Sequence, residues 1–132
     1  MDYLSKFAPE LLLLVFLAIA FGQSSIDKIV DWNGNLSWLK GHFSKTPFRN
    51  LVPLLLGCVL LTELLAGILC VIGFFTLSVN GDTAIAHWGA VVSCLALLML
   101  FLGQRLAKDY DGARTIAIYF VPAVFLVFLL QG

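Results

Sequence analysis

Charged side chains are scarce in this chain of 132 residues: only 12% are Asp, Glu, Lys or Arg, whereas 61% are hydrophobic. A soluble domain has roughly a quarter charged residues, so this chain has too few to cover a surface that faces water. The mean hydropathy of +0.99 agrees with this. We therefore expect lipid, or a larger membrane assembly, to contact most of the surface. The eight basic and eight acidic residues cancel, and a chain without a positive excess is not expected to bind nucleic acid.

Catalytic and cofactor motifs are also missing. The sequence contains no phosphate-binding loop, no covalent cofactor motif, no Ser-His-Asp set and no Cys/His cluster with metal-ligand spacing. The three cysteines, Cys58, Cys70 and Cys94, form no C-x-x-C pair. Cys58 and Cys70 lie about 18 Å apart along one predicted helix, which is too far for a disulfide. We expect all three to be small packing residues, and nothing here indicates a metal site or an autonomous enzyme.

Long apolar runs are what the chain has instead. A helix needs about 20 mostly apolar residues to cross a bilayer, and four segments meet this requirement: about 9–30, 51–79, 83–106 and 113–130. The predicted fold class is an all-α, polytopic membrane protein, with residues 1–132 forming one domain, a bundle of four transmembrane helices. Small residues recur four positions apart, as at Ala86 and Ala90, a pattern typical of close helix contacts in lipid.

The first span is the weakest, because its last turns contain five polar residues: Gln23, Ser24, Ser25, Asp27 and Lys28. Its beginning also resembles a signal peptide, with Lys6 followed by an apolar stretch and the cleavage-site-like sequence Ala18-Ile19-Ala20. Residues 22–32, however, have the amphipathic pattern of a helix that continues. We therefore expect this segment to be kept as a transmembrane helix.

Residues 31–50 form the only substantial connection, whereas Asn80-Gly81-Asp82 has the chemistry of a tight turn. The long connection combines tryptophans with lysines, a mixture that suits the lipid headgroup region. Residues 36–43 are predicted to form a short interfacial helix.

The basic residues are divided unequally between the two ends of the predicted bundle. Lys6 alone lies on the side of the termini. The other side holds Lys28, Lys40, Lys45, Arg49, Arg105, Lys108 and Arg114. Since cytoplasmic loops carry the excess of Lys and Arg, we expect loops 31–50 and 107–112 in the cytoplasm and both termini outside, in a bacterial cytoplasmic membrane.

Glu63 is the most informative residue, because it lies near the middle of the second span. A carboxylate at that depth costs a few kcal/mol, so it usually has a partner or faces a cavity. If Val30 and Leu51 mark one membrane boundary, Lys28 lies roughly 3 Å and Glu63 roughly 18 Å below it. Side chains lean toward the N-terminus of their helix, so these two lean toward each other. The predicted polar cluster consists of Gln23, Ser24, Lys28, Thr62 and Glu63.

Two interpretations of this cluster stay open. It is either a structural pair that sets helix register, or a site for a proton, an ion or a quinone headgroup, since ionisable groups within a membrane are functional by default. His87, beside Trp88, has the chemistry of a haem or metal ligand. No second His lies in any span and His42 is on the opposite side, so we expect His87 at an interface, as we do Trp32 and Trp38.

Two segments carry a resemblance to a known family. They are S-S-I-D-K-I, from Ser24 to Ile29, and T-E-L-L-A-G-I-L-C-V-I-G-F-F-T, from Thr62 to Thr76. Together they resemble the DoxX-like superfamily of small four-helix membrane proteins, which have a lysine at the end of the first helix and a glutamate followed by two glycines in the second. The matching residues here are Lys28, Glu63, Gly67 and Gly73, whereas Ser25 stands where the family usually has glycine.

The resemblance implies a four-helix bundle, and some relatives are associated with quinol-oxidising or thiol-redox membrane complexes. The leading hypothesis is therefore a DoxX-like accessory subunit of a larger membrane assembly; its cofactor stays open, with a quinone as the candidate that the resemblance suggests. The alternatives are a small transporter or channel that uses the Glu63 cluster, and an assembly or chaperone-like factor without chemistry of its own. The expected partners are the lipid bilayer and either other membrane subunits or further copies of the chain.

Overall fold

The computed structural model describes residues 2–44 and 50–131, and these residues form helices without any strand. The helices are α1 (Asp2–Lys6), α2 (Ala8–Val30), α3 (Trp32–His42), α4 (Val52–Asn80), α5 (Ala84–Leu106) and α6 (Tyr110–Gln131). Four of them, α2, α4, α5 and α6, are long and apolar enough to cross a membrane. The predicted all-α fold class with four spans is therefore confirmed. Lys45 and Arg49, which contribute to the basic asymmetry, lie outside the described residues.

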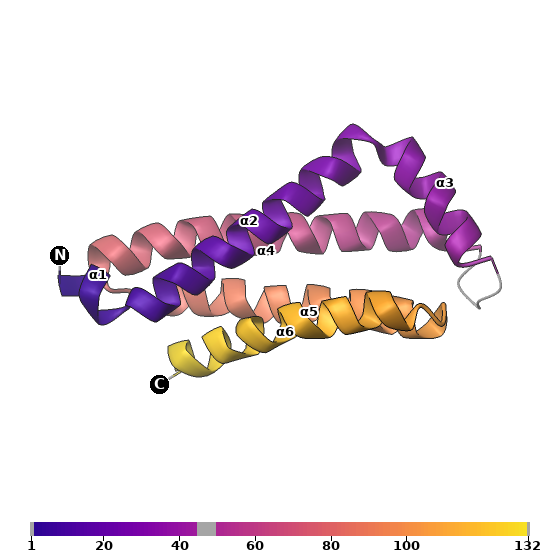
Figure 1. The fold of residues 1–132 in the computed structure, drawn as a ribbon. Coiled ribbons are helices and arrows are strands. Elements are labelled where there is room, and N and C mark those ends of the chain that lie inside the picture. The colour runs from indigo at the N-terminus through magenta and orange to yellow at the C-terminus, as the bar shows by residue number, and fades with distance from the viewer. Residues whose placement is uncertain (1, 45–49, 132) are drawn as a thin grey trace.

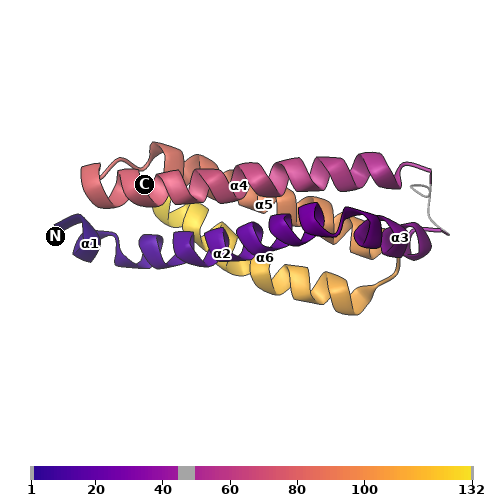
Figure 2. The same cartoon turned by 90° about the horizontal axis from the view of Figure 1, so that it is seen from above.

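The four long helices form an elongated bundle, with both chain ends at one end of it and α3 at the other (Figures 1 and 2). Helix α4 packs against α2 and α5, and α5 packs against α6. Helices α2 and α6 meet over a much smaller area. The bundle is therefore least closed between its first and last spans.

Capping residues set several helix limits that hydropathy does not predict. Asp31 accepts a hydrogen bond from the backbone N–H of Gly34 (3.3 Å), so α3 begins at Trp32 rather than at residue 36. Asp109 accepts one from the backbone N–H of Gly112 (3.0 Å), so α6 begins at Tyr110 rather than at residue 113. Gly81 ends α4 with a φ of 69°, as expected for the tight turn.

The end of α2 differs from the prediction. Lys28 contacts Glu63 directly, although Glu63 lies about 17 Å along α4 from its first residue. The assumption that Val30 and Leu51 lie at one membrane boundary is therefore wrong: α2 stops well short of the level at which α4 begins. Helix α3 spans the remaining distance and runs back to that end of α4 (Figure 1).

Small residues bring α4 and α5 unusually close together. A Cβ atom on Gly73 would lie 2.6 Å from the Cα of Ala86, and one on Gly89 would lie 3.0 Å from the backbone nitrogen of Cys70. Ala86 and Ala90 are fully buried at this contact. The predicted close packing of small residues thus occurs between α4 and α5.

Candidate functional site

The carboxylate of Glu63 is buried inside the bundle and forms an ion pair with a lysine from another helix. Its Oε1 lies 2.9 Å from the Nζ of Lys28, and the two side chains are 2% and 16% exposed. Lys28 also donates a hydrogen bond to the Oγ of Ser24, one turn earlier in α2 (2.7 Å). Apart from this ion pair, Oε1 has no partner among the described residues. Lys28 is therefore the group that compensates the charge of Glu63.

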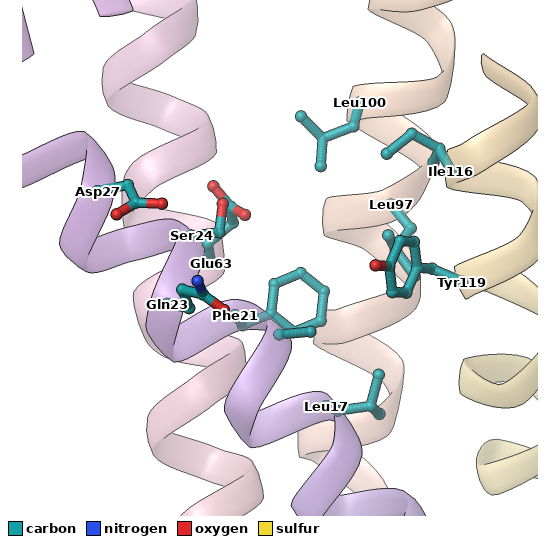
Figure 3. A pocket seen from close by; sticks show the side chains of 11 residues that line it. Leu17, Phe21, Gln23, Ser24, Asp27, Glu63, Leu97, Leu100, Ile116 and Tyr119 are labelled. Atoms are coloured by element: carbon teal, nitrogen blue, oxygen red, sulfur yellow. The ribbon is translucent and has the colours of Figure 1, made fainter. Parts of the chain in front are cut away.

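A cavity of about 300 Å³ lies beside this carboxylate. We call it the Glu63 cavity. Its lining residues are Leu17, Ala20, Phe21, Gln23, Ser24, Asp27, Glu63, Leu97, Leu100, Ile116 and Tyr119. Figure 3 shows that the polar groups of α2 and α4 face the apolar side chains of α5 and α6 across it, with the Tyr119 hydroxyl directed inward. The cavity therefore has a polar wall and an apolar wall, and it draws residues from all four spans.

The Glu63 cavity opens where the bundle is least closed. Gln23 and Asp27 on α2 are exposed, as is Tyr119 on α6. The rings of Phe16 and Tyr119 stack at a centroid distance of 5.8 Å and join the two helices at one edge of the opening. Since both helices are long enough to span a membrane, this opening faces sideways, toward lipid or a neighbouring protein.

The structure does not bring all five residues of the predicted cluster together. Gln23, Ser24 and Glu63 line the cavity and Lys28 pairs with Glu63. Thr62 does not join them, because neighbouring residues on a helix point roughly 100° apart. Its hydroxyl donates instead to the carbonyl of Cys58, 2.7 Å away.

Asp27 lines the Glu63 cavity but was not among the residues that the sequence singled out. Its spacing could have identified it, because it follows Gln23 by four residues and Ser24 by three, and such residues share one face of a helix. The cavity wall therefore holds two carboxylates, and the lysine that pairs with one of them lies behind it.

A second cavity, of about 320 Å³, lies under α3 on the far side of the ion pair. We call it the α3 cavity. Its lining residues are Lys28, Asn35, Trp38, Leu39, Phe43, Val52, Leu55, Leu56, Val59, Met99, Leu100, Leu102, Gly103 and Gln104. Lys28 lines this cavity while Glu63 lines the first one, and Leu100 lines both. The ion pair and Leu100 therefore stand between the two cavities.

The free end of α3 is tied to the loop between α5 and α6. The Nε2 of His42 lies 3.2 Å from the Oδ2 of Asp109, and the His42 ring stacks on Trp38 at 4.6 Å. The backbone N–H of Gly112, and after it the His42 ring, hold the pKa of the Asp109 carboxyl below its usual value. Asp109 thus remains charged at neutral pH, which favours this attachment of α3.

The other residues singled out in the sequence lie away from the Glu63 cavity. His87 is half-buried near the opposite end of the bundle, with its ring beside that of Trp88. Trp32 is half-buried at the start of α3, while Trp38 is 60% exposed and lines the α3 cavity. Cys58 is exposed, Cys70 is buried and Cys94 is intermediate, and all three are free thiols. Within residues 2–44 and 50–131, no group of three or more His, Cys, Asp or Glu side chains is placed to hold a metal ion.

Comparison with protein-family models, curated proteins and solved structures found no match to this chain.

Proposed function

We propose that this chain is an accessory subunit of a larger membrane assembly and that its Glu63 cavity binds the headgroup of a lipid-soluble redox carrier of the quinone class. The observation that carries the proposal is a buried, ion-paired carboxylate on the wall of a cavity that opens sideways between α2 and α6. A ligand dissolved in the bilayer can enter through such an opening without crossing water. The resemblance to the DoxX-like superfamily, with Lys28 and Glu63 among its matching positions, supports the same function.

The polar groups of the cavity suit both redox forms of such a headgroup. The hydroxyls of Ser24 and Tyr119 and the amide of Gln23 donate hydrogen bonds to quinone carbonyls. The carboxylates of Glu63 and Asp27 accept hydrogen bonds from the hydroxyls of a quinol. The apolar residues from α5 and α6 provide a surface for the ring, as in most small-molecule sites. This chain would then bind and orient the carrier, while a partner subunit exchanges electrons with it.

A binding measurement with a short-chain quinol tests this function. We expect Glu63→Gln to weaken binding about tenfold or more, because it replaces a charged acceptor, whose hydrogen bonds are worth roughly 1.5–3 kcal/mol, with a neutral one. Tyr119→Phe should weaken binding of the quinone form by a few fold, because it removes one neutral donor. Titration of the purified protein in nanodiscs, followed by tryptophan fluorescence, measures both effects.

The matched control is Tyr110→Phe, which makes the same change on the same helix at a residue that is 54% exposed and outside the cavity. It should bind as the wild type does. If Glu63→Gln binds quinol normally yet the protein no longer assembles with its partners, the ion pair is structural and the proposed site is wrong. Normal binding and normal assembly would favour an assembly factor that does not use the cavity.

A transporter that uses Glu63 is the second candidate, favoured by the two cavities on either side of the Lys28–Glu63 pair. Purification in mild detergent followed by reconstitution into liposomes discriminates between the two functions. Other membrane chains that co-purify with this protein favour the accessory subunit. A partner-free oligomer with a proton flux that Glu63→Gln abolishes would establish the transporter instead.

We further propose that α3 and the α5–α6 loop face the cytoplasm of a bacterial cell, with both termini on the other side of the cytoplasmic membrane. The basic residues at the α3 end of the bundle support this orientation. A protease added to spheroplasts should therefore remove an epitope tag fused after Gly132. The same tag placed in the 107–109 loop should be protected, and the reverse pattern would show that the orientation is wrong.

A further inference from the structure

Asp27 carries a charged side chain at a level of the bundle that is otherwise apolar. Its neighbour Lys28 contacts Glu63, about 17 Å along α4 from the first residue of that helix. Asp27 therefore lies within about one helical turn of this depth. The same turn of α2 exposes side chains that suit lipid, since Ile26 and Val30 are 60% and 79% exposed. Asp27 is thus an exposed carboxylate in surroundings that suit hydrocarbon rather than water.

The chain supplies no counter-charge for this carboxylate. Neighbouring residues on a helix point roughly 100° apart, and the amine of Lys28 is engaged by Ser24 and Glu63. In the part of the chain that the structure describes, no other basic group forms an ion pair with Asp27 either. Two carboxylates against one lysine leave one formal negative charge uncompensated beside the Glu63 cavity. A charge at such a depth costs a few kcal/mol unless it is paired.

The ligand proposed above for the Glu63 cavity does not compensate this charge. Quinone and quinol headgroups are both neutral, so they exchange hydrogen bonds with the cavity wall without bringing a positive charge. Phospholipid amines remain at the membrane surface, about 15 Å from the middle of the hydrocarbon core. A protein can bring a cation to the depth of Asp27, and beside lipid it does so on a transmembrane helix. The missing counter-charge therefore points to a helix of another chain.

The opening beside Asp27 offers room for such a helix. Helices α2 and α6 contact each other over a much smaller area than the other neighbouring spans do. The stack of Phe16 on Tyr119 joins them at one edge, and α2 diverges from α6 toward the α3 end of the bundle (Figure 1). Figure 3 shows the Asp27 carboxylate at the polar wall of the cavity, on the same side as Ser24 and Glu63. A helix seated between α2 and α6 would therefore meet this carboxylate.

We propose that the opening between α2 and α6 docks a transmembrane helix of a partner subunit, and that an arginine or lysine within the apolar span of this helix pairs with Asp27. The inference rests on the proposed role as an accessory subunit and names the docking surface and the chemistry of the partner. The docked helix supplies the missing side wall of the Glu63 cavity. The bound carrier then lies between the two subunits, where a partner that exchanges electrons with it has to be.

Model transmembrane peptides in nanodiscs test the proposal. Two peptides of about 20 Leu and Ala residues differ only at one central position, which is Arg in one and Leu in the other. Energy transfer from the tryptophans of the protein to a dansyl group on the peptide measures binding. The wild type should bind the Arg peptide about tenfold or more tightly than the Leu peptide, because a charge-assisted pair forms. Asp27→Asn should bind the two peptides equally.

Asp82→Asn is the matched control, since it makes the same change at an exposed aspartate outside the cavity. Asparagine can still accept the hydrogen bond that Asp82 receives from the backbone N–H of Ala84 (3.0 Å). This variant should keep the wild-type preference for the Arg peptide. Asp27→Lys should reverse it and prefer a peptide with a central Glu, which shows that charge pairing, rather than a general change in α2, sets the preference.

Equal binding of the Arg and Leu peptides by the wild type would overturn the proposal, and so would Asp27→Asn that retains the preference. A wild-type oligomer that Asp27→Asn dissociates in the absence of peptide would overturn it too, because the occupant would then be another copy of this chain. Quinol binding is measured without any peptide. Its absence would count against the quinone site alone, and the preference for the Arg peptide is judged separately.

Discussion

Replacing Lys28 with methionine is expected to destabilise the protein by about 3 kcal/mol, because it leaves Glu63 buried without its counter-charge. Glu63 is 2% exposed, and no other described cation contacts it. Methionine keeps much of the packing of the aliphatic part of the lysine side chain, so the loss of stability results mainly from removal of the positive charge. Thermal unfolding in a mild detergent measures it as a lowered midpoint.

Two further variants separate the ion pair from general effects of removing a lysine. Lys40→Met removes an exposed lysine from α3 and should change the midpoint little. The double variant Lys28→Met/Glu63→Leu replaces both charges with apolar groups and should regain most of the lost stability, as buried ion pairs generally do when both partners are replaced. A double variant as unstable as Lys28→Met alone would contradict the assignment of Lys28 as the counter-charge of Glu63.

Gly73→Leu is expected to separate α4 from α5 and to destabilise the bundle by about 3 kcal/mol, at the upper end of the usual effect of overpacking. Even a single Cβ atom at this position would lie 2.6 Å from the Cα of Ala86 and 2.7 Å from its backbone nitrogen. Backbone atoms cannot turn aside as a flexible side chain can, so the two helices must move. Because α5 carries Leu97 and Leu100 into the Glu63 cavity, quinol binding should be lost together with stability.

Gly57→Leu is the matched control, since it makes the same substitution in the same helix where no neighbouring atom lies within 4 Å of the added Cβ. It should retain the wild-type midpoint and the wild-type quinol affinity. Equal effects of Gly57→Leu and Gly73→Leu would indicate that leucine disturbs α4 through its own backbone rather than through the contact with α5.

The sequence alone was sufficient to predict the number of spans and to identify Glu63 as a candidate site residue. Hydropathy depends on local composition, so four apolar segments predict four helices whatever their arrangement. Glu63 stands out for the same reason, because a charge amid apolar neighbours is visible without any knowledge of the fold. The sequence also indicated Lys28 as a residue that leans toward Glu63, although it placed the two roughly 15 Å apart in depth.

Helix capping determined where α3 and α6 begin, which hydropathy does not predict. Asp31 and Asp109 each accept a hydrogen bond from a backbone N–H three residues later, and they lengthen α3 and α6 at their starts. Such bonds depend on single polar residues at the ends of apolar segments. A scan for long apolar runs therefore misses them, although the residue types are those expected at the start of a helix.

The composition and order of residues determined that this chain forms four apolar helices with an acidic residue near the middle of one of them, because the hydropathy of each segment decides whether it can cross lipid. Only the tertiary structure decided where those helices stop relative to one another. The early end of α2 places Lys28 against Glu63 and creates the space beneath α3. The rotation of α4 about its axis excludes Thr62 from the cluster. These outcomes depend on the tilt, depth and rotation of whole helices. Packing at contacts such as that between Gly73 and Ala86 sets these quantities, and no local pattern in the sequence predicts them.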